Sequence, residues 1–209
     1  FVPAFKGLVT GDYGNAVVII NAGLLSTFFA GAMVFSLRGA EQPLNKRGGL
    51  LLIVLMWSVL PLFAAIPIYF SGVVITPVKA LFEAISGLTT TGATVIGHLD
   101  TQPAAILIWR AILQWLGGFY TIVSATAIIV ALGIGGMQLQ YATMPHGGGQ
   151  TLFGRLRQSG SVLLSVYALL TVMCFIALWV AGMPMFDALC HALSTVSTGG
   201  FSTRDGSIG

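Results

Sequence analysis

The sequence predicts an all-α integral membrane protein, and three observations carry this prediction. Of the 209 residues, 56% are hydrophobic and only 7% are charged, whereas a soluble domain carries about 25% charged residues. The few charges leave long uncharged stretches that could each cross a bilayer as a helix. Most basic residues lie between those stretches. Soluble enzymes, nucleic-acid-binding proteins and disordered chains are therefore not expected.

Four membrane-spanning helices are expected from the uncharged stretches. They lie near residues 13–37, 49–70, 103–132 and 159–181. The first would be about 38 Å long as a helix, which exceeds the hydrocarbon thickness of roughly 30 Å. Buried helices of a large soluble protein are the alternative, but apolar runs of this length are uncommon there.

Basic residues indicate the orientation of these helices. The loops 38–47 and 133–158 hold the basic residues Arg38, Lys46, Arg47, Arg155 and Arg157. By the positive-inside rule, both loops are expected to be cytoplasmic. An even number of crossings must then separate them, and helices 49–70 and 103–132 supply two. The segment 78–100 is therefore expected to enter from the outer side and return, or to lie on the surface.

The composition of this segment favours a pore loop. As a helix, Ala84–Leu99 would be about 24 Å long, too short to cross. It is rich in glycine and threonine, namely Gly87, Gly92, Gly97, Thr89, Thr90, Thr91 and Thr94. Irregular backbone at membrane depth is tolerated only when it packs inside protein or lines a watery cavity. A short helix followed by such backbone is typical of a pore loop.

The end of the chain repeats this segment 108 positions later, which is the step from Gly92 to Gly200. The matched pairs are Ala80 and Ala188, Leu81 and Leu189, Ala84 and Ala192, Ser86 and Ser194, and Thr90 and Thr198. A repeated supersecondary unit is a stronger signal than either copy alone.

The repeated segment suggests cation chemistry. A helix that descends into the membrane carries the negative end of its dipole there, worth roughly half an elementary charge. Carbonyl and threonine oxygens beyond it are ligands for a desolvated monovalent cation. Glycine allows the positive φ that lets successive carbonyls face one axis, and Gly92 and Gly200 are the candidates for that role. The few carboxylates argue against a divalent ion.

Three charged residues are candidates for the outer mouth or for the ends of the short helices. Glu83 and Asp187 are expected early in those helices, where a carboxylate offsets the positive end of the dipole, although attraction of cations is an alternative. Arg110 is expected to snorkel to the interface or to pair with Glu83 or Asp100, with shaping of the field at the mouth as the alternative.

Four strings resemble the Trk/Ktr/HKT superfamily of potassium transporters, within which the Trk-type uptake proteins are most similar. Phe82–Thr94 and Phe186–Phe201 resemble its first and second filters, Trp109–Gly118 the start of an inner helix, and Gly133–Leu139 the cytoplasmic exit of that helix. The resemblance implies ion-binding filter residues at Thr90, Thr91, Gly92, Ala93, Thr198, Gly199, Gly200 and Phe201.

The resemblance also implies an organisation of four helix–pore-loop–helix units, of which this chain would hold about one and a half. A peripheral helix and loop would occupy 1–47, the first unit 48–135 with its filter near 89–94, and a cytoplasmic linker 136–158. A truncated second unit would occupy 159–209, with its filter near 197–202. The chain is accordingly expected to be an N-terminal piece of a longer transporter.

The function implied is potassium uptake, with K⁺ as the transported ion, no covalently bound cofactor and no enzymatic step. The expected location is the cell inner membrane, among lipids. The expected partners are a second copy in a homodimer and a cytoplasmic nucleotide-binding regulatory subunit, with no nucleic acid. Sodium or mixed transport is an alternative, which glycine at both key positions disfavours. A re-entrant-loop secondary carrier for another solute is a further alternative.

Overall fold

The structure, a computed structural model, describes residues 14, 17, 46–132 and 152–207. In these ranges the regular elements are all helical: α3 (Lys46–Phe70), α4 (Pro77–Leu88), the short 3-10 helix η1 (Leu99–Thr101), α5 (Ala104–Leu132), α7 (Leu152–Val180) and α8 (Met185–Val196). The predicted helix 13–37 and the loops 38–47 and 133–158 lie wholly or largely outside the described residues.

Three of the described helices are long and apolar enough to cross a membrane. Their apolar spans are Ile53–Phe70 in α3, Ala104–Thr126 in α5 and Gly160–Val180 in α7. These are the helices expected from the uncharged stretches, so the prediction of an all-α membrane protein is confirmed. Both α3 and α7 begin several residues before the predicted starts, because lysine, arginine and leucine are good helix formers that extend a helix beyond its apolar span.

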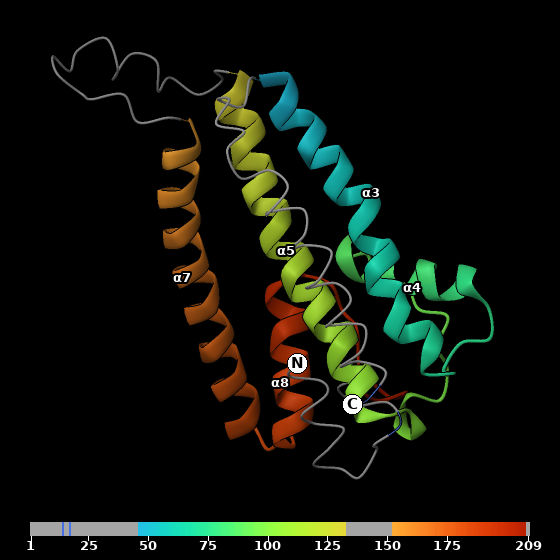
Figure 1. Cartoon of the computed structure of the whole chain (residues 1–209). Coiled ribbons are helices and arrows are strands. Elements are labelled where there is room, and N and C mark those ends of the chain that lie inside the picture. The colour runs from blue at the N-terminus through green and yellow to red at the C-terminus, as the bar shows by residue number, and fades with distance from the viewer. Residues whose placement is uncertain (1–13, 15–16, 18–45, 133–151, 208–209) are drawn as a thin grey trace, which may run out of the picture.

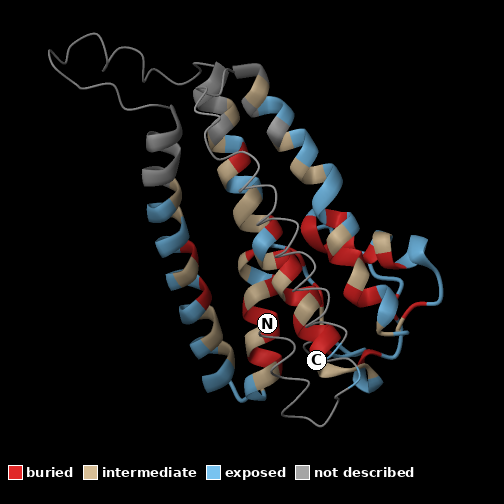
Figure 2. Ribbon diagram, in the orientation of Figure 1, coloured by how far each residue is buried: buried red, intermediate tan, exposed pale blue. Residues whose placement is uncertain are grey.

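Helix α5 is the central element of the bundle. It contacts α3, α4, α7 and α8, and Figure 1 shows the long helices beside one another with α4 and α8 against the lower half of α5. Within its apolar span 44% of residues are buried, against 11% in the span of α7. Figure 2 accordingly shows buried residues gathered around α4, α5 and α8, while α7 is largely exposed.

The two short helices have matching lengths and positions. Both α4 and α8 contain 12 residues, about 18 Å of helix, which is well short of a bilayer. Their bounds differ by the same 108 positions as the sequence repeat. Thr76 caps α4 by accepting a hydrogen bond from the backbone N–H of Lys79, and Pro77 opens the helix.

Candidate functional site

Each short helix leads into a loop, and the two loops have the same backbone turn. We define the first loop as 89–98 and the second loop as 197–203. Matched N–H groups donate to matched carbonyls: Thr90 to Gly87 at 3.0 Å, Thr91 to Ser86 at 2.9 Å, Thr198 to Thr195 at 2.9 Å and Gly199 to Ser194 at 2.9 Å. This pair of bonds is the Schellman motif that ends many helices. Both short helices therefore stop for the same local reason.

Threonine occupies the left-handed position of this motif in both loops. The φ angle is 55° at Thr90 and 58° at Thr198. Glycine usually fills that position, because a β-branched residue is strained at positive φ. Strained backbone of this kind concentrates at functional sites. The repeated threonine therefore points to a role for these two positions beyond ending a helix.

The two predicted key glycines lie two residues further on, in the conformation expected of them. Their φ angles are 77° at Gly92 and 78° at Gly200, in the region that only glycine enters without strain. A β-carbon on Gly92 would also overlap the carbonyl oxygen of Gly199. The first loop thus needs glycine for both conformation and space, and its backbone lies directly against that of the second loop.

The eight predicted filter residues divide into exposed and buried positions. Thr91, Ala93, Thr198 and Gly200 are exposed, and Thr90 and Gly92 are half-buried. Gly199 and Phe201 are buried. The second loop therefore presents Thr198 and Gly200 outward and turns the two residues that alternate with them into the protein.

Phe201 and Gly199 pack against α5. The Phe201 N–H donates to Oε1 of Gln114 at 3.0 Å, and the Phe201 ring lies 4.2 Å beneath the guanidinium of Arg110. A β-carbon on Gly199 would overlap the Gln114 amide. Gln114 is not among the site residues that the sequence predicts. The available signal was its position four residues after Arg110, which puts both on one face of a helix.

A buried carboxylate anchors the first loop. Glu83 is fully buried and accepts hydrogen bonds from the Thr94 hydroxyl at 2.7 Å, the Val95 N–H at 2.9 Å and Nε of Arg110 at 2.8 Å. A buried carboxylate with three donors, one of them cationic, is well compensated. The loop beyond Gly92 is therefore tied back to its own helix.

The predicted role of Glu83 at the start of its helix is wrong. No acidic residue lies in the first turn of α4, which begins at Pro77, so Glu83 comes too late to offset the positive end of the dipole. Its partner is Arg110, one of the two predicted pairings for that arginine. Arg110 is buried rather than snorkelling, and Asp100 pairs instead with Arg204 at 3.4 Å.

Arg110 joins the two loops. It donates to the Thr94 hydroxyl of the first loop at 3.0 Å and to the Ser202 carbonyl of the second loop at 3.3 Å. One side chain of α5 therefore holds both loops through charge-assisted hydrogen bonds, which are stronger than neutral ones.

A second carboxylate anchors the second loop in a similar way. Asp187 lies in the first turn of α8, as predicted. It accepts hydrogen bonds from the Thr203 hydroxyl at 2.7 Å and from Nε and Nη2 of Arg204 at 3.1 Å and 3.0 Å. The Asp187 carboxylate raises the pKa of Arg204, chiefly by accepting these hydrogen bonds. Thr203 and Arg204 are not among the site residues that the sequence predicts.

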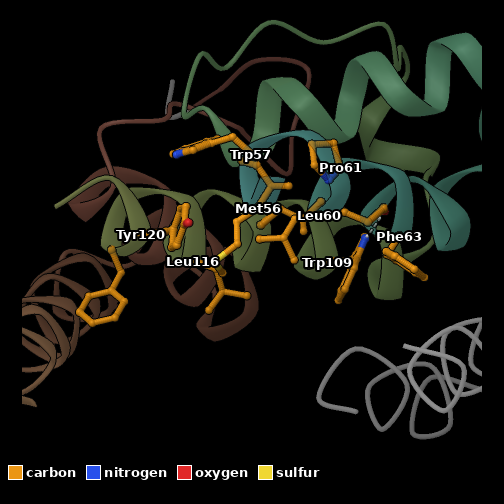
Figure 3. Close-up of a pocket in the computed structure, with 12 residues that line it drawn as sticks. Met56, Trp57, Leu60, Pro61, Phe63, Trp109, Leu116 and Tyr120 are labelled. Atoms are coloured by element: carbon orange, nitrogen blue, oxygen red, sulfur yellow. Dashed lines mark hydrogen bonds between the residues drawn. The ribbon is translucent and has the colours of Figure 1, made fainter. Parts of the chain in front are cut away.

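An apolar cavity lies between α3, α5 and the end of α4, at Leu88. Its volume is about 360 Å³, and the twelve residues that line it carry no charge. Figure 3 shows Met56, Leu60, Trp109 and Leu116 around it. The Trp109 indole N–H donates to the Ala64 carbonyl at 3.1 Å and so ties α5 to α3. This lining contains no carboxylate that could bind a cation.

The described residues contain no group of three histidine, cysteine, aspartate or glutamate side chains that could hold a metal ion. The oxygen-rich parts of the site are instead the backbone and hydroxyl groups of the two loops. Oxygen ligands of this kind suit alkali cations, which are bound by carbonyl oxygens that replace their hydration shell.

Comparison with known proteins identifies similar transporters. A family model described as TrkH, cation transport protein, matches residues 15–209. Over 190 residues the chain is 46% identical to the Trk system potassium uptake protein TrkH of Salmonella typhimurium, which covers 88% of this chain and 39% of that protein. Over 174 residues it is 48% identical to the protein of the same name from Halomonas elongata, covering 82% of this chain and 36% of that protein.

A solved structure is also similar. The crystal structure of the potassium transporter TrkH from Vibrio parahaemolyticus matches with a TM-score of 0.82 and 38% sequence identity, over 98% of this chain and 40% of that one. The chain thus spans less than half the length of the proteins that it matches.

Proposed function

Because this chain belongs to the TrkH family of cation transport proteins, we propose that its two loops form part of a filter through which potassium enters the cell. The relatives are named as potassium uptake proteins, which supports K⁺ as the transported ion. In the four-unit arrangement that the sequence resemblance implies, this chain supplies two of the four loops around the pathway.

One observation carries this proposal. Left-handed threonine and left-handed glycine recur at matched positions of both loops, with φ angles that agree within a few degrees. Extended residues cannot substitute for left-handed ones without rotating the adjacent peptide planes. We infer that this alternation turns carbonyl oxygens of both loops towards a shared axis, where they would replace the water around a monovalent cation.

The two short helices add a favourable field. The C-terminal ends of α4 and α8 lead directly into the two loops, and the C-terminal end of a helix carries partial negative charge. A carrier of anions would present helix N-termini to its substrate instead. The arrangement therefore supports cation transport and disfavours the secondary-carrier alternative for an anionic solute. The membrane potential contributes about 2.3 kcal/mol per charge per 100 mV to inward movement.

The orientation proposed for the chain follows its basic residues. Loops 38–47 and 133–158 face the cytoplasm of a cell whose inner membrane holds the protein, and the two filter loops open to the outer side. The relatives' names assign them to a Trk system. A homodimer and a cytoplasmic nucleotide-binding subunit are the partners that the sequence resemblance implies for such a system.

Rubidium uptake by potassium-starved cells that express the complete protein tests this function. Gly92→Asp is expected to abolish uptake while the protein still reaches the membrane, because the side chain would displace the Gly199 carbonyl. Gly200→Ala is expected to lower uptake and the preference for rubidium over sodium, because alanine strains the backbone at a φ of 78°.

The matched control is Gly72→Ala. Gly72 has a φ of 76°, and neither Gly72 nor Gly200 has a described atom within 4 Å of the place where a β-carbon would lie. The two substitutions therefore impose similar strain and differ in location, since Gly72 lies between α3 and α4. Uptake and selectivity that respond equally to both substitutions, or to neither, would contradict the proposed filter.

A further inference from the structure

Gln114 of α5 lies between the two loops, and its hydrogen bond with the second loop determines which way its amide group faces. The side chain is fully buried, and its Oε1 accepts the hydrogen bond from the Phe201 N–H at 3.0 Å. A backbone N–H can only donate, so the amide oxygen must face the second loop. The amide nitrogen, Nε2, must then face away from that bond.

The Nε2 group lies beside the backbone of the predicted filter. A β-carbon on Gly92 would lie 3.8 Å from Nε2, and one on Gly199 would overlap the amide itself. Among the described residues, no acceptor takes a hydrogen bond from Nε2. A buried amide donor therefore sits at the place where the backbones of the two loops meet.

The sequences of the two loops differ at the position that Gln114 contacts. Gly199 of the second loop matches Thr91 of the first, which is exposed. Only glycine leaves room for the amide at position 199. The second loop thus needs its two glycines for different reasons. Gly199 leaves room for the Gln114 amide, and Gly200 adopts a positive φ.

Resting on the proposed function, we propose that Gln114 is a positioning residue that sets the spacing between the two filter loops and so determines which monovalent cation they prefer. Its oxygen holds the second loop through the Phe201 N–H, and its nitrogen lies beside Gly92 of the first loop. Arg110 links the same loops one helical turn earlier, but at Thr94 and Ser202, beyond the glycines. Gln114 therefore acts at the level of the filter itself.

Two variants separate the functions of the two amide atoms in the complete protein. Gln114→Glu keeps an oxygen for the Phe201 N–H and replaces Nε2 with a second oxygen. Gln114→Met keeps a similar length and removes both hydrogen-bonding groups. Ser124→Ala is the control, because it removes a buried hydroxyl from the same helix about 15 Å away.

The measurement is rubidium uptake in competition with sodium, normalised to the amount of protein in the membrane. Both Gln114 variants are expected to lower the preference for rubidium over sodium by roughly fivefold to tenfold. For Gln114→Met this change corresponds to the loss of the one net hydrogen bond from the Phe201 N–H. For Gln114→Glu it follows from placing a second oxygen, in place of the amide N–H, beside the filter backbone. Ser124→Ala is expected to leave this preference unchanged. If either Gln114 variant reaches the membrane and keeps the preference of the unmodified protein for rubidium over sodium, the proposal is overturned.

The unmodified protein separates this proposal from the proposed function. If Gly92→Asp abolishes rubidium uptake while the Gln114 variants keep the preference of the unmodified protein for rubidium over sodium, the role of Gln114 is overturned and the filter stands. Cells that take up no rubidium with the unmodified protein would overturn the filter, and with it the role of Gln114.

Discussion

At the scale of single residues, the buried pair of Glu83 and Arg110 connects the fold to the site. Glu83 belongs to α4 and Arg110 to α5, and between them they hold Thr94 of the first loop and Ser202 of the second. Both side chains are almost completely buried. A buried ion pair with this many hydrogen bonds fixes geometry, and removal of one partner leaves an uncompensated charge.

We therefore expect Glu83→Gln and Arg110→Met each to destabilise the purified complete protein by about 3–5 kcal/mol. The double variant is expected to lose less than the sum, because it leaves no unpaired buried charge. The measurement is thermal unfolding in detergent. Asp100→Asn is the control: Asp100 pairs with Arg204 in an exposed position, and such pairs contribute little. Additive losses in the double variant would contradict the coupling.

The sequence predicts some of these residues and misses others for identifiable reasons. Gly92 and Gly200 are predictable, because glycine in polar backbone after a short helix signals positive φ. The left-handed Thr90 is not, because a β-branched residue is among the least expected at that φ. Gln114 shares a helix face with Arg110, but its hydrogen bond with Phe201, 87 residues away in the sequence, comes only from the packing of α5 against the loops.

At the scale of elements, charge spacing predicts the three long described helices well, and the repeat locates the two short ones. The prediction that Glu83 lies in the first turn of its helix is wrong because α4 begins earlier than expected. Thr76 and Pro77 supply the cap and the first helical residue, so α4 begins well before Glu83. A polar cap followed by proline is a start signal that the sequence does contain.

The close contact between α4 and α5 depends on Gly117. A β-carbon there would overlap the carbonyl oxygen of Leu88, the last residue of α4. Gly117→Ala is therefore expected to destabilise the complete protein by about 1–3 kcal/mol, as overpacking does, and to reduce rubidium uptake because it moves the helix end that leads into the first loop. Thermal unfolding and uptake measure the two effects.

Gly160→Ala is the matched control for this substitution. Gly160 lies within α7 and has no described atom within 4 Å of the place where the alanine methyl group would lie. Alanine is the better helix former by roughly 0.5–1 kcal/mol, so this variant is expected to be neutral or slightly stabilised. Equal destabilisation by the two substitutions would contradict a specific contact between α4 and α5.

At the scale of the whole molecule, α5 packs against two copies of the same unit, which consists of a long helix, a short helix and a loop. Helices α3 and α7 are each followed by a short helix, then by a loop with a left-handed threonine and a left-handed glycine. Helix α5 lies between the copies and carries Arg110, Gln114, Gly117 and Gly118 on one face. The sequence predicts the repeat itself, but the direct approach of Gly92 to Gly199 depends on tertiary packing around α5.

The proposed filter requires that the two loops bind a monovalent cation between them. Crystals of the complete protein grown with rubidium in place of potassium test it most directly, because anomalous scattering locates rubidium. An anomalous peak is expected beside the backbone oxygens of the two loops, near Gly92 and Gly200. Ordered rubidium elsewhere along the transport pathway, with none beside these loops, would contradict it.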